Sequence, residues 1–150
     1  MSDNVELPKA TSYYTSTHGA SALVENPKWR DTVKVTGYGA VISPAPSQLT
    51  GWVHFIIPFT TSRDQVQVIR DGYVRCSTSK AKITNVVVHD GEIQSAANAV
   101  SWSGQLFSHT FELIPPAYVA FAFVISCYVE FQSIDGVVNF AAAGLGWYYD

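Results

Sequence analysis

The sequence predicts an all-β protein, an antiparallel two-sheet β-sandwich of jelly-roll-like topology, with a small closed β-barrel as the alternative. Runs of β-branched and aromatic residues recur at roughly 10–15-residue intervals, and clusters of Gly, Pro, Asn and Ser separate them. No stretch shows the apolar periodicity of an amphipathic helix. Hydrophobic residues make up 47% of the chain and charged residues only 14%, which indicates extensive burial rather than disorder.

The chain of 150 residues has the length of one domain. Residues 1–17 are rich in Ser, Thr and Tyr and show no periodicity, so we expect them to form an N-terminal tail or a clasp across the body. Residues 18–150 are expected to form a single all-β domain.

The expected β-forming segments, in chain order, are 19–25, 31–42, 51–59, 66–79, 82–96, 106–114, 117–131 and 137–149. The first is stopped by an Asn-Pro pair, the second alternates valine with polar residues, and a Pro/Ser loop at 43–50 precedes the third. The third, with the sequence GWVHFIIPF, is apolar on both faces. The fourth has room for two short strands or for one strand bent at Asp71–Gly72.

The second half of the chain contains the clearest hairpin signal. A β-branched run enters Asp90–Gly91 and leaves through Glu92–Ile93, as a hairpin with a two-residue type I′ turn would. Segment 106–114 alternates cleanly and is ended by Pro115–Pro116. Segment 117–131 forms one long strand or two. The last segment contains the small-residue run AAAGLG, which allows another backbone or ring to approach closely.

Several of these segments together carry a family resemblance. The frame consists of HGASALVENP at 18–27, GYGAVI at 37–42, WVHFIIPF at 52–59 and NVVVHDGE at 85–92. It resembles a family of small all-β proteins in which a W-x-H-F-x-I-P strand is followed by a V-x-V-x-D-G hairpin. The resemblance covers most of the chain after residue 17. Because that family has no established activity, it implies a coherent all-β domain and assigns no catalytic residue.

The charge and the apolar segments restrict the partners and the location. The net charge is −3 and the basic residues are scattered, so the chain has no electrostatic footprint for nucleic acid. No basic segment followed by an apolar one marks a secretory signal, which predicts a cytoplasmic protein. The longest apolar stretch, at 117–131, is too short to span a membrane as a helix. Low charge and an aromatic content of 13% predict a homo-oligomer, because one small sandwich hides too little apolar surface.

The two cysteines, Cys76 and Cys127, both lie in apolar strand-like runs. We expect them to be buried free thiols, with a disulfide across the core as the alternative.

Two histidines are the candidate catalytic residues, because each lies on an apolar face of an expected strand. Strand alternation places His54 with Trp52, and it places His109 with two phenylalanines. We expect His54 to be buried, neutral and hydrogen-bonded, whether its role is structural or functional. His89, next to the expected turn, is predicted to be exposed.

The sequence predicts no metal site and no cofactor. It contains no H-x-H, H-x-x-x-H or C-x-x-C spacing, no G-x-S-x-G elbow, no P-loop and no dinucleotide fingerprint. The carboxylates nearest the apolar strands, Glu112 and Glu130, are expected on solvated strand faces.

Aromatic residues indicate ligand binding. Trp102 lies between serines and a glycine in an expected loop, where an exposed ring can stack on a sugar. The candidate ligand-binding residues are Trp52, Trp102 and Tyr118. The first hypothesis is a non-enzymatic binding or assembly module, lectin-like, whose partner is a small molecule or a carbohydrate. The alternative is a cofactor-free enzyme, isomerase- or cyclase-like, acting on a small apolar molecule in a cavity lined by Trp52, His54 and His109.

Overall fold

The computed structural model describes residues 13–59, 65–119 and 122–150. Its strands are β1 (Tyr13–His18), β2 (Leu23–Val24), β3 (Lys34–Thr36), β4 (Gly39–Ile42), β5 (Thr50–Ile57), β6 (Gln67–Ser79), β7 (Ala81–Asp90), β8 (Ile93–Trp102), β9 (Phe107–Tyr118), β10 (Phe123–Phe131) and β11 (Val137–Tyr149). Two short 3-10 helices are η1 (Gly19–Ser21) and η2 (Pro27–Thr32). None of the described helices is long and apolar enough to cross a membrane.

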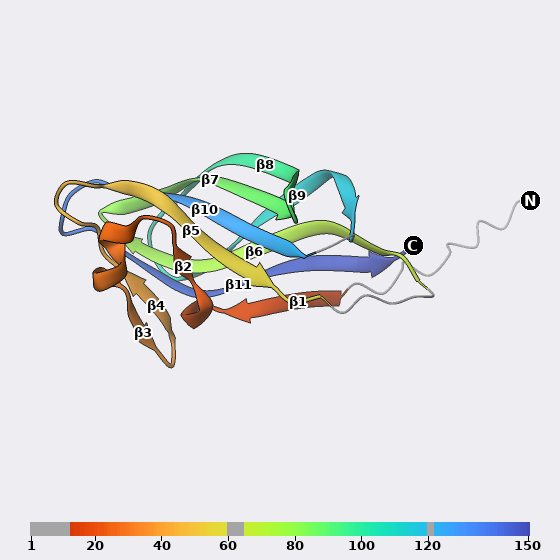
Figure 1. Ribbon diagram of the computed structural model, residues 1–150, viewed down its shortest axis with the longest axis horizontal. Helices are drawn as coiled ribbons and strands as arrows, with labels where there is room; N and C mark the ends of the chain where they lie inside the picture. The colour runs from red at the N-terminus through yellow and green to blue at the C-terminus, as the bar shows by residue number, and fades with distance from the viewer. Residues whose placement is uncertain (1–12, 60–64, 120–121) are drawn as a thin grey trace, which may run out of the picture.

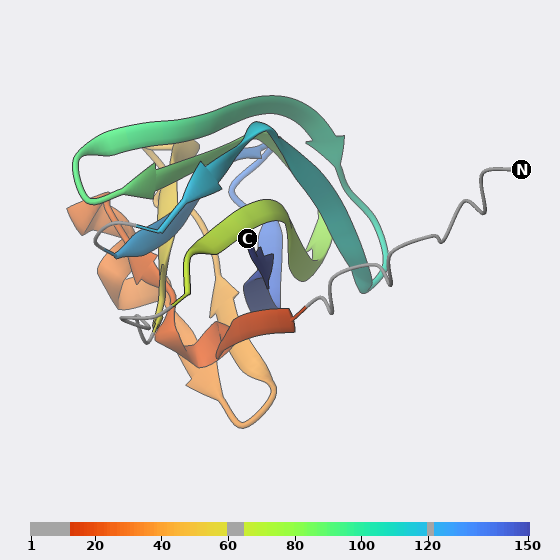
Figure 2. The same cartoon turned by 90° about the vertical axis from the view of Figure 1, so that its right-hand side faces the viewer.

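These strands form two antiparallel sheets packed face to face, which confirms the predicted β-sandwich (Figure 1). Sheet A has the order β3-β4-β11-β6-β9, and β1 is also paired with β11. Sheet B has the order β2-β5-β10-β7-β8. Within the described residues β8 and β9 each pair with a single strand, so the sandwich is open along this side and the alternative closed barrel is not formed (Figure 2).

The core lies between the sheets and is filled by the inward-facing residues of each strand. Val53, Phe55 and Ile57 of β5 are almost completely buried, and the Phe55 ring meets the Phe140 ring of sheet A with centroids 5.1 Å apart. Trp29 of η2 closes one end of the core, where its indole N–H donates to the carbonyl of Gln48. Burial of this apolar surface supplies the main stabilisation of the fold.

The first part of the domain differs from the expected pattern. Residues 19–25 form η1 and the two-residue β2 instead of one strand. The His18 side chain accepts a hydrogen bond from the amide of Ala20, and this cap bends the chain into the turn. The helix η2 was not expected; the side chain of Asn26 caps it, and Pro27 occupies its first turn. Residues 31–42 contribute the end of η2 and the β3–β4 hairpin.

The segment 66–79 forms one strand, β6, with a register irregularity between Ile69 and Asp71, and not two short strands. The β7–β8 hairpin is confirmed, with Asp90 paired to Ile93. Of the two loop residues only Gly91 has a positive φ, of 59°, which matches a type II′ turn better than the expected type I′ turn.

Two strands continue beyond their predicted ends. β8 extends through Trp102, where a loop was expected. β9 continues through Pro115–Pro116 to Tyr118. Proline is tolerated there because β9 is an edge strand that, among the described strands, pairs only with β6. The expected long segment 117–131 is divided between the end of β9 and β10.

Two further expectations concern the N-terminus and the cysteines. Residues 13–17 of the expected tail belong to β1, whose Tyr13 stacks on Trp147 with centroids 4.7 Å apart. Residues 1–12 lie outside the described residues. Cys76 and Cys127 are buried free thiols, as expected.

Candidate functional site

The main candidate site is a groove on the outer face of sheet B. Alternation along β5, β10 and β7 turns every second side chain away from the core. The strand register places Tyr128 directly opposite Trp52, and Ser126 directly opposite His54. These rows leave a hollow of about 270 Å3. The residues that line this groove are Glu25, Trp52, His54, Val87, His89, Gln94 and Ser126.

A chain of hydrogen bonds crosses the groove. His54 Nδ1 lies 2.7 Å from Ser126 Oγ, and His54 Nε2 lies 2.7 Å from Glu25 Oε2. A carboxylate only accepts hydrogen bonds, so in the neutral imidazole Nε2 carries the proton and Nδ1 accepts from the Ser126 hydroxyl. The ring is therefore fixed at both nitrogens, and its orientation is set before any ligand binds.

Trp52, which lines the groove, packs against Tyr128, which lines a neighbouring hollow. The Trp52 and Tyr128 rings lie 5.0 Å apart with an interplanar angle of 52°. A second hollow of about 360 Å3 lies beyond this pair and shares Glu25 and Trp52 with the groove. The two hollows together form an extended depression with a half-buried indole at its centre. Flat rings next to hydrogen-bonding groups suit a ligand that has both an apolar face and polar edges.

The structure corrects the expectation that His54 is buried. Its side chain is 29% exposed, because no strand among the described residues packs over the outer face of sheet B. The expected hydrogen bonding is confirmed at both ring nitrogens. Because His54 and Trp52 are both on this outer face, the apolar pattern of segment 51–59 arises from one core face and one groove face.

The predicted convergence of Trp52, His54 and His109 is wrong. His109 lies on β9 in sheet A, where it stacks on Trp102 with centroids 5.1 Å apart and an interplanar angle of 14°. Burial lowers the pKa of His109 below its usual value. His109 therefore packs at the open side of the sandwich, away from the groove.

Trp102 is buried, with 8% exposure, and not in an exposed loop as expected. The reason is that β8 continues to Trp102, and its alternation turns the indole toward the core. Tyr118 is 60% exposed at the end of β9 and does not line the groove. His89 is half-buried in the groove, although the sequence indicated an exposed residue next to the turn.

No sequence pattern indicated Glu25, Ser126, Tyr128 or Gln94 as residues of the site. Ser126 and Tyr128 are two residues apart on one strand, as His54 and Trp52 are, but the pairing of these strands joins positions 72 residues apart. Glu25 reaches His54 because β2 pairs with β5, and a two-residue strand has almost no sequence signal. Only the shared alternation could have suggested Ser126 and Tyr128.

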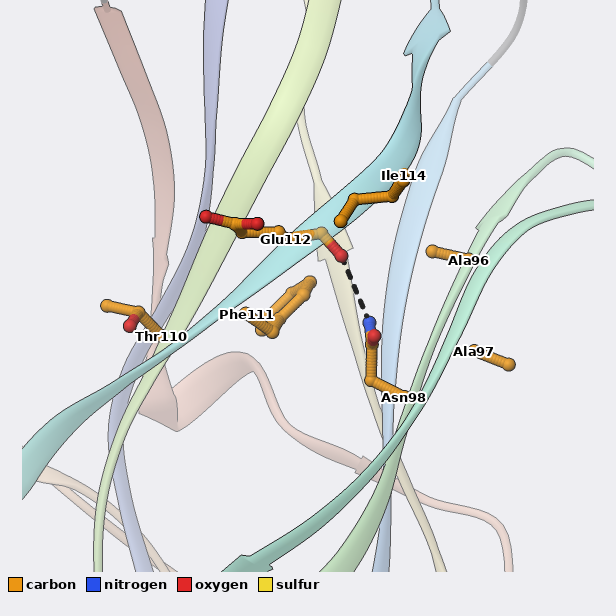
Figure 3. A pocket seen from close by; sticks show the side chains of 7 residues that line it. All are labelled: Ala96, Ala97, Asn98, Thr110, Phe111, Glu112 and Ile114. Carbon is orange, nitrogen blue, oxygen red and sulfur yellow. Dashed lines mark hydrogen bonds between the residues drawn. The ribbon is translucent and has the colours of Figure 1, made fainter.

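A larger hollow, of about 470 Å3, lies where the edges of β8 and β9 face each other (Figure 3). The Asn98 amide donates across this seam to the carbonyl of Glu112, at 3.3 Å. Figure 3 shows the Glu112 carboxylate pointing away from Asn98 and the Phe111 ring between the two strands. Two alanines and an exposed isoleucine complete much of its lining, so it presents fewer groups for recognition than the groove.

Among residues 13–59, 65–119 and 122–150, no group of three or more His, Cys, Asp or Glu side chains is placed to hold a metal ion. The groove offers hydrogen bonding, ring stacking and two imidazoles, those of His54 and His89.

No protein-family model and no curated protein matches the chain. Among solved structures, the CBM36-1 domain of a multidomain xylanase from the hindgut metagenome of Trinervitermes trinervoides is similar, with a TM-score of 0.51, 9% identity, and coverage of 90% of this chain and 96% of that domain. The apo structure of CBM1 of BiXyn10A has a TM-score of 0.56 and 15% identity, covering 87% and 94%. The chain shares their fold. A carbohydrate-binding module CBM36 in complex with calcium and xylotriose also matches, with a TM-score of 0.46, 11% identity, and coverage of 87% and 98%.

Proposed function

We propose that this protein is a non-enzymatic binding module that holds a short stretch of a neutral glycan in the groove on sheet B. The observation that carries the proposal is the placement of the Trp52–Tyr128 pair next to a row of fixed hydrogen-bonding groups. A pyranose ring has an apolar face that packs on an indole and hydroxyls at its edge that bond to polar side chains. The fold shared with a domain of a xylanase supports this class of ligand.

The groups in the groove favour a neutral glycan over an acidic one. The Glu25 carboxylate reaches into the groove, and of the described residues that line it none is Lys or Arg. A uronic acid or a sulfated sugar would therefore meet a negative charge without a fixed cation to offset it. The exposed Glu25 carboxylate, held by its hydrogen bond to His54, and the exposed Gln94 amide present polar atoms to sugar hydroxyls instead.

The test is isothermal titration calorimetry with two neutral probes, xylohexaose and cellohexaose. Trp52→Ala is expected to weaken binding of the accepted probe 10- to 100-fold, or about 1.4–2.8 kcal/mol, because it removes the ring on which a sugar packs. Tyr38→Ala is the matched control, since Tyr38 is 87% exposed at the β3–β4 turn and lies outside the groove. Equal affinities of Trp52→Ala and the wild type would contradict the proposal.

A second candidate function is proton transfer by His54, which the Ser126–His54–Glu25 chain favours. A base oriented by a carboxylate and bonded to a hydroxyl is the arrangement used in acid–base and nucleophilic catalysis. However, Ser126 lies on a strand paired on both sides, with His54 and with Val87, so the backbone ladder leaves no evident N–H group for a developing oxyanion. Hydrolysis of 4-nitrophenyl acetate by the wild type, lost in both Ser126→Ala and His54→Gln, would establish this function in place of simple binding.

A further inference from the structure

The outer face of sheet A contains a separate hollow, on the opposite side of the sandwich from the groove. It measures about 300 Å3 and is lined by Tyr14, Asp71, Gly72, Tyr73, Ser108 and Thr110. It shares no lining residue with the groove on sheet B, and the whole core lies between the two faces. We name it the sheet A hollow.

Two glycines of β11 make room for the side chains of the sheet A hollow. A Cβ atom at Gly146 would lie 1.8 Å from Asp71 Oδ1, and one at Gly144 would lie 2.6 Å from the Tyr73 ring. Any larger residue at these positions would push the carboxylate and the ring outward. The glycines of the AAAGLG run thus allow the side chains of Asp71 and Tyr73 to pack directly on the backbone of β11.

The carboxylate of Asp71 is incompletely satisfied. Its Oδ1 atom is buried and accepts no hydrogen bond from the residues that the structure describes, while Oδ2 lies 3.9 Å from the guanidinium of Arg70. Burial and the neighbouring carboxylate of Glu112 raise the pKa of Asp71, although Arg70 opposes them. A buried acceptor without a partner is uncommon in folded proteins, and a bound donor is one reason for it.

Aromatic and hydroxyl groups surround this carboxylate. The Tyr14 and Tyr73 rings meet edge to face with centroids 6.2 Å apart, and the Tyr73 hydroxyl bonds to Ser16 Oγ at 2.5 Å. Tyr14 is 61% exposed, so one ring is free to pack on a ligand. Strand register places Thr110 opposite Tyr73, on the same face of the sheet.

We infer that the sheet A hollow is a second saccharide site, so that one molecule binds two glycan chains on its opposite faces. A sugar hydroxyl donates to the Asp71 carboxylate, whose side chain lines the hollow and is 31% exposed, and the exposed Tyr14 ring supplies a surface for the sugar ring. The negative charge selects a neutral sugar, as in the groove. This inference rests on the proposed function for the ligand class but on different residues. Its consequence is that the protein bridges polysaccharide chains.

The experiment is isothermal titration calorimetry with xylohexaose and with cellohexaose, which measures the number of sugar molecules bound per protein chain. The wild type is expected to bind two molecules of the accepted probe per chain, and Trp52→Ala and Asp71→Ala one each. Thr110→Trp fills the sheet A hollow from an exposed edge position and is expected to leave one as well, even if Asp71→Ala fails to fold. Glu112→Gln is the control for loss of charge, because Glu112 lies next to Asp71 but outside the hollow.

The outcomes separate the two sites. In one outcome the wild type and Thr110→Trp both bind one sugar molecule per chain, and Trp52→Ala binds none. This result overturns the second site and supports the groove. Binding that survives Trp52→Ala unchanged but is lost in both Asp71→Ala and Thr110→Trp supports the sheet A hollow and overturns the groove. If neither hexasaccharide binds the wild type, both assignments are overturned.

Discussion

Replacing His54 with Leu removes the two hydrogen bonds that hold the groove together, and the larger part of the cost is expected to come from Ser126. The Ser126 side chain is 5% exposed, and its hydroxyl lies 2.7 Å from His54 Nδ1. Without the imidazole this hydroxyl is left buried and unpaired, which costs about 1–3 kcal/mol. Glu25 is 61% exposed, so loss of its contact with His54 adds only about 0–1 kcal/mol.

The expected destabilisation of His54→Leu is therefore about 2 kcal/mol, which corresponds to a fall in Tm of roughly 4–8 °C in a domain of this size. Ser126→Ala alone is expected to cost less, about 0.5–1.5 kcal/mol, because water reaches the half-buried imidazole that loses its partner. In the double variant no hydroxyl remains to be orphaned. The loss of unfolding free energy in the double variant should therefore be smaller, by at least about 1 kcal/mol, than the sum of the losses in the two single variants.

Urea unfolding of the four proteins measures this coupling, with the m-value checked for constancy between them. Glu25→Gln is the companion variant, expected to change stability by less than about 1 kcal/mol. Additivity of His54→Leu and Ser126→Ala within about 0.5 kcal/mol would refute the reasoning, because it would mean that the two side chains do not depend on each other.

Three further predictions concern other parts of the molecule. Native protein is expected to react slowly with a thiol reagent near pH 8, and unfolded protein to expose two thiols, because burial raises the pKa of Cys76 to about 12 and also raises that of Cys127; rapid labelling of the native state would contradict this. Burial lowers the pKa of His109, so the unfolded state binds a proton more readily, and stability should fall as the pH drops from about 6.5 toward the folded pKa. That slope should be shallower in His109→Gln, and identical slopes would exclude His109 as its source. The predicted homo-oligomer should give at least twice the monomer mass in light scattering at micromolar concentration, whereas a monomer mass would remove that prediction.

The sequence was sufficient to predict the class of fold, because that depends on local signals. Alternation in segment 106–114 and the Asp-Gly pair before β8 reflect the chemistry of single strands and turns. Helix η2 was not predicted, because six residues are too few to show the apolar periodicity of a helix. Asn26 and Pro27 are nevertheless residues typical of a helix N-terminus.

The groove could be predicted only in part. Trp52 and His54 were identified as candidates because an imidazole is unusual in an apolar run, but the same argument placed His54 in the core. Whether an apolar strand face is covered depends on what packs over it, and that is decided by the whole topology. The misplacement of Trp102 has a similar origin, because Gly and Ser around a ring suggest a loop until a long neighbouring strand extends the pairing.

The prolines on β9 limit edge-to-edge strand pairing between molecules of this protein. β9 is an edge of sheet A among the described strands, and Pro115 and Pro116 have no N–H groups to offer to an added strand. On the facing edge, the Asn98 side chain already occupies the carbonyl of Glu112. With the two proposed sites, molecules would line up along a polysaccharide at a high local concentration, where exposed edges favour fibril growth. The prolines interrupt such a ladder without altering either of the two proposed binding faces.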